Sequence, residues 1–448
     1  MARGAAKSGN GKRLATQQSV NAAVKAICDI MRRSNCAGAL QYVPELTWIL
    51  FLRILDERET RERDETEAVG VEFTPSLEAP YRWQDWAAPD GGRRKALQDG
   101  TLGGFFAFVN GELLPHLKAL RERPRATPRQ KVISEIMSGV ERTRIDTERN
   151  LLDVLDKVNE LSGERVDPTH VFALSQVYEG LLLKMGEKGN DGGQFFTPRE
   201  VIRAMVRVID PRIGETEYDP GCGTGGFLAQ AYEHMAGPGN AKIHSADQLD
   251  TLKRRTFYGR EKDNAIYPIG LANLVLHDID EPHIWHGNTL TGQETYGGLF
   301  TDAPALFDVI LMNPPFGGKE GKEAQTRFAY KTRATQVLFL QHVIGALTPG
   351  GRCGISGIKV GKKSPLTLAH FEDFLRLLPD RTDSERSWTV DRKAIDEKGY
   401  DLKAVNPHAK KNEDLRTPEE LLDLIEAKGR EVAEAVATLR SLTRPRDE

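Results

Sequence analysis

The tetrapeptide Asn313-Pro314-Pro315-Phe316 contains the residue types that could bind an exocyclic amine. It follows the apolar run 307–312, which predicts a buried strand that ends at the proline pair, because proline cannot continue a ladder of hydrogen bonds. Ligands bind at the carboxyl ends of strands in open α/β sheets. There the Asn313 side-chain oxygen and the Pro314 carbonyl would each accept one N–H from the amine, and Phe316 would stack on its ring. The alternative is a plain proline turn after a strand.

A glycine-rich segment, residues 219–227, could cradle a ligand that approaches the backbone closely. A helix expected to start near Phe227 would present its N-terminus to a carboxylate. The spacing G-x-G-x-G-G differs from the dinucleotide fingerprint and from the Walker loop. Downstream, Glu261 at the end of Tyr258-Gly259-Arg260-Glu261 is placed to accept hydrogen bonds from a ribose diol, with a surface carboxylate as the alternative.

These elements, in this order, resemble the S-adenosylmethionine-dependent amino-methyltransferases. A fourth element, Gly193-Gln194-Phe195-Phe196-Thr197-Pro198-Arg199, opens a helical run and resembles the cofactor-binding segment of the methyltransferase (M) subunits of type I restriction–modification systems. These subunits belong to the N6-adenine DNA methyltransferases. Similar segments follow at residues 272–277, 287–290, 336–342, 384–390 and 400–402, so the resemblance covers most of the chain.

The resemblance implies transfer of a methyl group from S-adenosylmethionine, the expected cofactor, to N6 of adenine in DNA. The target adenine would be held by Asn313, Pro314, Pro315 and Phe316. The cofactor would be held by Gln194, Phe195, Phe196, Thr197, Pro198, Arg199, Asp219, Gly221, Gly223, Thr224, Gly225, Gly226, Glu261 and Asn288. A methyl group on positive sulfur is already activated, so the reaction needs mainly positioning and no strong general base. A paired adenine must first be flipped out of the duplex.

Composition excludes several classes of protein. The 448 residues allow two or three domains, and no apolar stretch reaches membrane-spanning length. The four cysteines form no C-x-x-C pair, which fits a reduced cytoplasm and argues against a zinc site, so no metal is expected. Lys plus Arg total 62 against 65 acidic residues, and no DNA-reading module is evident, so sequence selection is expected from a partner.

The resemblance supplies the partners. They are DNA, a separate specificity (S) subunit and a second copy of the M subunit. A restriction (R) subunit is a further candidate, since no nuclease or helicase motif is visible and cutting would need another chain.

We expect a disordered basic tail at residues 1–15, a helical N-terminal domain at 16–165, a methyltransferase domain at 166–383 and a helical, partner-binding tail at 384–448. The fold class expected is α/β, a class I S-adenosylmethionine-dependent methyltransferase with a Rossmann-like, mostly parallel sheet. The N-terminal domain would contact DNA and partners, or serve as plain helical support.

Four further segments carry expectations. Residues 57–67 mix charges densely and predict a solvated helix face, and residues 71–104 predict an irregular insertion. Residues 352–356 predict the strand after the catalytic one. In the tail, a capping box at residues 417–420 precedes an apolar seam that suits either a partner helix or its own domain.

Two departures from the family pattern stand out. Only 28 positions separate Ser356 from Ser384, which suggests an internal deletion that truncates the sheet at its last strands. Glu217 occupies a position where a buried strand should be apolar, so its carboxyl would either be protonated or reach solvent. The alternative function is therefore a catalytically impaired assembly subunit that binds cofactor. A third candidate function is methylation of another amide or amine, such as a protein glutamine or an RNA base.

Overall fold

The computed structural model describes residues 17–34, 36, 39–68, 70–160, 197–298, 303–315, 318–355, 371–384, 387–400 and scattered positions between 407 and 434. Four predicted site residues, Gln194, Phe195, Phe196 and Phe316, lie outside this part, as does the predicted 1–15 tail. The chain divides into two compact units, Met1–Arg376 with Arg392–Leu402, and Leu377–Asp391 with Lys403–Glu448. The predicted domain boundaries at 165 and 383 stay predictions.

The first part of the larger unit is helical, as the sequence predicts. Threonine side chains start two of its helices: Thr127 and Gln130 form a reciprocal capping box at α7, and Thr147 accepts the Asn150 N–H at α8. The helices are α1 (Gln17–Arg32), α2 (Ala39–Ala68), α3 (Trp83–Trp86), α4 (Gly92–Gln98), α5 (Gly104–Phe108), η1 (Val109–Leu113), α6 (Leu114–Lys118), η2 (Ala119–Glu122), α7 (Pro128–Met137) and α8 (Glu148–Asn159).

The predicted irregular insertion at residues 71–104 is only partly irregular. It contains α3 and α4, and the indole rings of Trp83 and Trp86 are fully buried and contact each other edge to face. The two helices are too short for a periodic apolar pattern to reveal them.

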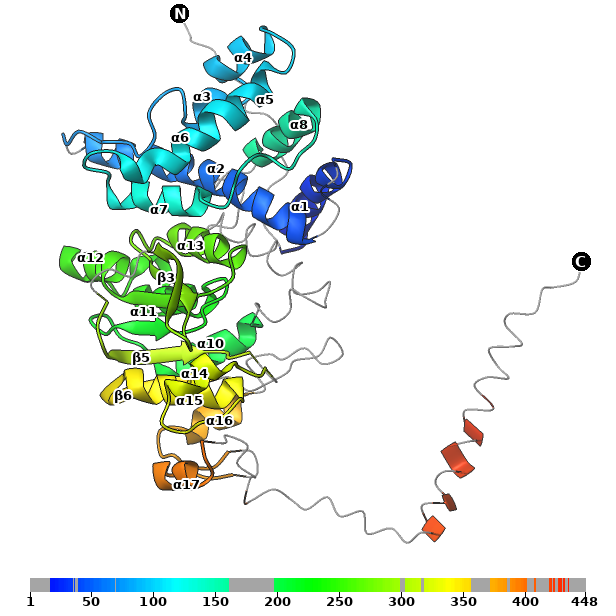
Figure 1. Ribbon diagram of the computed structural model, residues 1–448, viewed down its shortest axis with the longest axis vertical. Helices are drawn as coiled ribbons and strands as arrows, with labels where there is room; N and C mark the ends of the chain where they lie inside the picture. Colours follow the sequence, from blue (N-terminus) through cyan, green and yellow to red (C-terminus); the bar gives the residue numbers. More distant parts are fainter. Residues whose placement is uncertain are drawn as a thin grey trace, which may run out of the picture. The chain divides into compact units, whose positions relative to one another are not determined.

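A six-stranded sheet follows, in the order β4-β3-β2-β1-β5-β6 (Figure 1). Strands β1, β2, β3, β5 and β6 pair in parallel, and only β4 runs antiparallel, along β3. The strands are β1 (Glu217–Asp219), β2 (Phe257–Glu261), β3 (His283–Asn288), β4 (Gln293–Gly298), β5 (Phe307–Met312) and β6 (Leu347–Ile355). The bounds of β5 are those of the predicted apolar run, and the expected mostly parallel sheet is confirmed.

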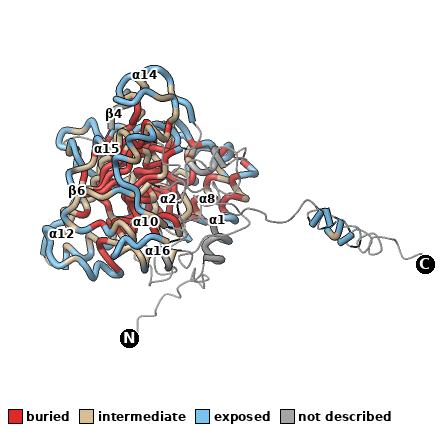
Figure 2. The backbone as a smooth tube through the Cα atoms, turned by 90° about the horizontal axis from the view of Figure 1, so that it is seen from below, coloured by how far each residue is buried: buried red, intermediate tan, exposed pale blue. Residues whose placement is uncertain are grey.

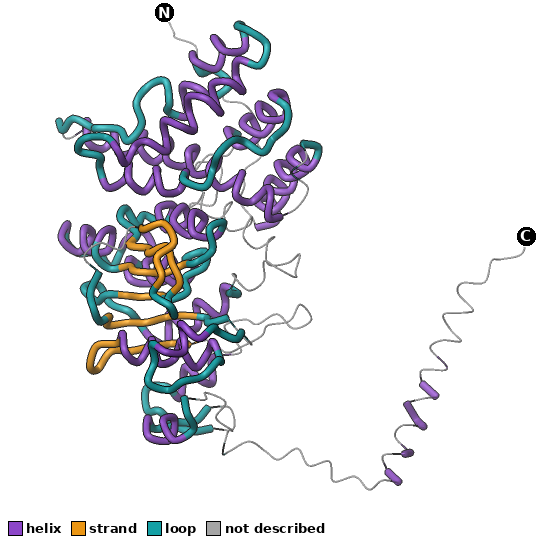
Figure 3. The backbone as a smooth tube through the Cα atoms, viewed as in Figure 1, coloured by secondary structure: helices purple, strands orange, loops and turns teal. Residues whose placement is uncertain are grey.

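Helices cover both faces of this sheet (Figure 3). Side chains alternate between faces along a strand, and those of β5 enter two separate apolar clusters. Val309 and Leu311 pack with α10, α11 and α13, whereas Ile310 and Met312 pack with α15. The helices are α10 (Arg199–Ile209), α11 (Gly226–Ala236), η4 (Pro238–Asn240), α12 (Ala246–Arg254), α13 (Ile266–Leu276), α14 (Lys322–Thr326), α15 (Thr335–Ala346), α16 (Glu372–Leu377) and α17 (Arg392–Glu397). Exposed residues gather in the segment that leads into α12 and around α14 (Figure 2).

Strand β6 begins earlier than predicted, at Leu347 in place of residue 352, because the 347–351 segment pairs with the start of β5 across an irregularity in register. In the described part of the chain β6 forms one edge of the sheet, and no described strand follows it. Residues 356–370 are outside the described part, so the internal deletion stays a hypothesis.

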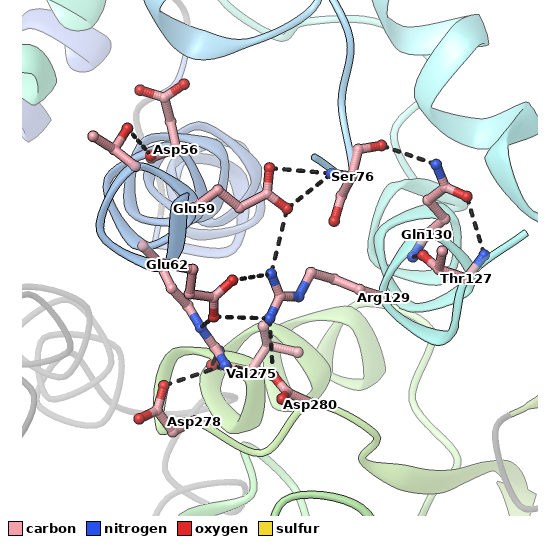
Figure 4. A network of polar contacts seen from close by, with 12 residues as sticks. Asp56, Glu59, Glu62, Ser76, Thr127, Arg129, Gln130, Val275, Asp278 and Asp280 are labelled. Carbon is pink, nitrogen blue, oxygen red and sulfur yellow. Dashed lines mark hydrogen bonds and ion pairs between the residues drawn. The ribbon is translucent and has the colours of Figure 1, made fainter. Parts of the chain in front are cut away.

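The helical region and the sheet share one continuous apolar cluster, in which α13 packs against α2 and α7. A polar network joins the same three helices (Figure 4). It contradicts the predicted solvated face at residues 57–67 only in part. Arg61, Asp64, Glu65 and Glu67 are exposed as predicted, whereas Arg58 and Glu59 are each only 8% exposed. Their partners lie far away in the sequence: Arg58 bonds Asp280, and Glu59 accepts the Ser76 N–H.

Candidate active site

The ends of four parallel strands meet at a cavity of about 280 Å³. Asp219, Glu261 and Asn288 are the last residues of β1, β2 and β3, and Asn313 follows β5; all four line the cavity. The strand order changes direction here, since β1 lies between β2 and β5. A crevice at such a switch point is the usual ligand site of an open α/β sheet.

Most of the sequence-predicted site residues line this one cavity. These are Thr197, Arg199, Asp219, Gly221, Gly223, Thr224, Gly226, Glu261, Asn288, Asn313 and Pro315. Three others are described but absent from the lining. Pro198 precedes α10, Gly225 precedes α11, and Pro314 is buried directly after Asn313. The structure therefore brings together segments that are far apart in the sequence.

The glycine loop forms a tight turn from β1 into α11. The Asp219 side chain accepts the Gly221 N–H at 3.0 Å, and the Gly225 N–H donates to the Cys222 carbonyl at 2.8 Å. Gly225 has φ of 75°, a left-handed conformation that favours glycine. Burial raises the pKa of Asp219 to about 8, and the nearby Glu261 carboxyl adds to the rise.

Glu261 is buried, 6% exposed, so the surface alternative is wrong. Its carboxylate accepts the Gly223 N–H at 3.0 Å and the Asp263 N–H at 2.7 Å, which ties the end of β2 to the glycine loop. Burial raises its pKa, while these backbone donors oppose the rise. A carboxylate has about four lone-pair directions, so it retains capacity for hydroxyl donors from a ligand.

Asn313 is oriented by a residue of the predicted cofactor segment. Its Nδ2 donates to Thr197 Oγ1 at 3.1 Å, and its Oδ1 is buried without a hydrogen-bond partner in the described part of the chain. Arg199, two residues after Thr197, begins α10. Burial lowers the pKa of Arg199 to about 10, which still leaves it a cation at neutral pH in the cavity wall.

The structure adds cavity residues that the sequence reasoning assigned no role. Asn273 on α13 is 3% exposed and donates from Nδ2 to the Thr224 carbonyl at 2.8 Å, while its Oδ1 has no described partner. It is the only amide in the apolar run of α13, a signal that could have singled it out. Glu320, Thr335 and Phe339 also line the cavity, from the segment after β5.

Glu217 lies beside the site in β1 and points into the core. It is 0% exposed, its neighbours in register are Phe257 and Val309, and neither carboxyl oxygen has a hydrogen-bond partner among the described residues. Burial raises its pKa well above the usual value, and the charges of Asp219 and Glu215 add to the effect. Of the two expectations for Glu217, the protonated carboxyl therefore fits the structure and the solvent-reaching one does not.

Across the described residues, no group of three or more His, Cys, Asp or Glu side chains is arranged to hold a metal ion. A search of the same residues finds no helix with the length and apolar character needed to span a membrane.

The sheet order, the switch-point cavity and the glycine loop before α11 define a class I methyltransferase fold. Two families match the chain: N-6 DNA Methylase over residues 170–358, and the HsdM N-terminal domain over residues 20–158. The chain therefore belongs to the type I restriction–modification methyltransferase subunits of the N-6 DNA methylase family.

Several relatives are similar over much of the chain. The EcoEI methylase subunit of Escherichia coli is 33% identical over 75% of this chain and 64% of its own length. The EcoKI methylase subunit of Escherichia coli strain K12 is 28% identical over 73% and 56%. The chain thus spans less than two thirds of the length of these curated relatives.

Two solved structures share the fold. A modification subunit of a predicted type I restriction enzyme from Vibrio vulnificus YJ016 has a TM-score of 0.70 at 27% identity, covering 89% of this chain and 98% of that one. A chain from a structure of assembly and conformational transition in the type I R-M system has a TM-score of 0.65 at 29% identity, covering 97% and 100%.

Proposed function

We propose that this chain is the modification subunit of a type I restriction–modification system. It transfers a methyl group from S-adenosylmethionine to N6 of a flipped-out adenine in DNA. A separate S subunit selects the sequence, and a second M subunit and an R subunit are further partners. The similarity to type I methylase subunits supports this proposal.

The observation that carries the proposal is the position of Asn313. Its Nδ2 is engaged by Thr197, its Oδ1 has no hydrogen-bond partner among the described residues, and Asn313 lines the same cavity as the glycine loop. An amine that donates one N–H to this oxygen, and another to the Pro314 carbonyl, directs its lone pair toward an electrophile in that cavity. The Thr197 contact orients the amide, and a local movement that exposes the buried Oδ1 would let the amine donate to it.

The cavity residues fit S-adenosylmethionine. The N-terminus of α11 and the Arg199 guanidinium favour its carboxylate, and the buried Glu261 carboxylate accepts hydrogen bonds from its ribose hydroxyls. Asn273 Oδ1, which has no hydrogen-bond partner in the described part of the chain, is an acceptor for the cofactor's ammonium group. When bound, the cofactor supplies a methyl group activated by positive sulfur. No residue of the site needs to act as a strong base, since the attacking amine loses its proton after the transfer.

A cation-rich loop beside the cavity supports a nucleic-acid substrate. Residues 318–334 leave and rejoin the cavity wall at Glu320 and Thr335, and the two arms are joined by the Glu320 N–H to Arg333 carbonyl bond at 2.9 Å. The loop carries Lys319, Lys322, Arg327, Lys331 and Arg333, against only two acidic residues. Within the described chain none of these cations forms an ion pair, and all five are exposed. Such a surface suits phosphates.

The test is methyl transfer from labelled S-adenosylmethionine to DNA by the chain co-expressed with its cognate S subunit. We expect N6-methyladenine from the wild type. An Asn313→Ala variant should lose at least about 100-fold in rate, the scale for removing one preorganised polar group, while binding the cofactor as well as the wild type does. Transfer that survives this substitution contradicts the assignment of Asn313. Transfer to RNA or to a protein glutamine, and not to DNA, would show a different substrate.

The second candidate function is an assembly subunit that binds cofactor but turns over poorly. The edge position of β6 favours it, since no described strand covers that edge. The match to a chain from the type I R-M system covers 100% of that chain, so this protein lacks no part of it. That similarity favours the active enzyme. Cofactor binding without transfer in the complete complex would establish this second function.

A further inference from the structure

Helix α13 connects the cavity to the helical region, because it contacts both. On its cavity side, Asn273 bonds the Thr224 carbonyl, and Gly270 lies so close to the glycine loop that an added Cβ would come within 2.8 Å of the Gly223 carbonyl. The side chain of Leu274 lies against Gly225. The position of α13 therefore fixes the position of the loop.

The other side of α13 is held by charged residues of α2 and α7 (Figure 4). Arg58 donates from Nη1 to the Val275 carbonyl at 3.0 Å, a carbonyl that also accepts the Asp278 N–H at 3.1 Å, and so places a cation at the negative end of α13. Asp280, just beyond the helix, bonds Arg58 and accepts from Arg129 Nη2 at 3.2 Å.

Glu62 of α2 holds both arginines, Arg58 on its own helix and Arg129 on α7. Glu62 accepts two hydrogen bonds from Arg129, at 2.7 and 3.0 Å, and one from Arg58 Nε at 2.9 Å. The side chains of Asp280 and Arg129 are only 15% and 18% exposed. Burial alone would raise the pKa of Asp280, but Arg58, Lys253 and Arg129 together lower it, so it is an anion at neutral pH.

We propose that Arg58, Arg129 and Asp280 are positioning residues for S-adenosylmethionine binding. Through them the helical region fixes the C-terminal end of α13, and α13 in turn fixes residues 223–225. None of the three lines the cavity. The inference rests on the proposed function, because it concerns the same cofactor. It assigns to the helical region a role in the cofactor site itself.

The test compares cofactor binding by the full-length wild type with that of an Asp280→Asn variant, which keeps the side-chain size and removes the charge. Titration calorimetry with S-adenosylmethionine should show a dissociation constant at least about 5-fold higher in the variant, the lower end of typical coupling between sites. Amide hydrogen exchange at Gly223 and Gly225 should also accelerate.

The matched control is Thr147→Ala, which removes the α8 N-cap bond in the same helical region without touching α13. It should lower the unfolding temperature yet leave cofactor affinity within about 2-fold of the wild type. If Asp280→Asn fails to fold, Arg129→Lys replaces it, because lysine keeps the charge and loses the two-pronged bond to Glu62.

Three outcomes are distinguishable. A wild type that does not bind S-adenosylmethionine contradicts the proposed function. A folded Asp280→Asn (or Arg129→Lys) variant that binds as tightly as the wild type overturns the positioning role alone. Equal weakening in Thr147→Ala also overturns it, since the effect would then follow general stability.

Discussion

Glu217 offers a direct measurement of what a buried, unpartnered carboxyl costs this fold. It lies in the central strand β1 between Phe257 and Val309, fully buried and without a hydrogen-bond partner in the described residues. Two substitutions separate its effects. Glu217→Gln removes the titration and keeps polar atoms, whereas Glu217→Met removes both at similar volume.

The direction of the pH dependence follows from the raised pKa. The unfolded chain loses this proton near pH 4.5, while the folded chain retains it to a higher pH because burial and the charges of Asp219 and Glu215 oppose ionisation. The folded state therefore binds more protons between the two pKa values. The contribution of Glu217 is fully present below pH 4.5 and falls by about 1.4 kcal/mol per pH unit as pH rises toward the folded-state pKa.

We expect Glu217→Gln to unfold with a shallower loss of stability than the wild type between about pH 5 and pH 7. Glu217→Met should be more stable at neutral pH by roughly 1–3 kcal/mol, the cost of one unsatisfied buried polar group, in addition to the titration effect. The assay is urea unfolding of the complete chain at several pH values, with the difference from wild type isolating Glu217 from other groups. A Gln variant with the wild-type pH slope, or a less stable Met variant, would refute this reasoning.

Other predictions concern the cation-rich loop at residues 318–334 and the glycine turn from β1 into α11. Replacing Lys319 and Lys322 together by alanine should make the dependence of log K for DNA binding on log salt less steep. The slope should fall by up to about 2, because each lost phosphate contact contributes about 0.9. The same change at two exposed arginines, Arg254 at the end of α12 and Arg255 just after it, should leave the slope unchanged. Equal losses in both variants would show that the loop is not part of the DNA surface. Gly225→Ala should cost roughly 1–2 kcal/mol because its φ of 75° is left-handed. It should also weaken cofactor binding; a thermal midpoint and affinity equal to wild type would contradict this.

The local parts of this protein could be predicted from its sequence. The bounds of β5 match the apolar run 307–312, because a run with five apolar residues in six that is closed by a proline pair favours a buried strand with a definite end. The turn into α11 follows from its glycines, and the start of α7 from its capping box. Each of these depends on residues within a few positions of one another.

Tertiary structure decided what depends on distant partners. The 57–67 run predicts a solvated face by its charges, yet Arg58 is buried against Asp280, 222 positions away. Asn273 becomes part of the site only because α13 packs on the glycine loop, and Glu217 is enclosed because β1 lies between β2 and β5. Local sequence fixes where helices, turns and strands begin and end, since caps, glycines, prolines and apolar patterns act over a few residues, although the strands pair with distant partners. Whether a charge is paired, exposed or enclosed is set by segments that meet only when the whole chain packs.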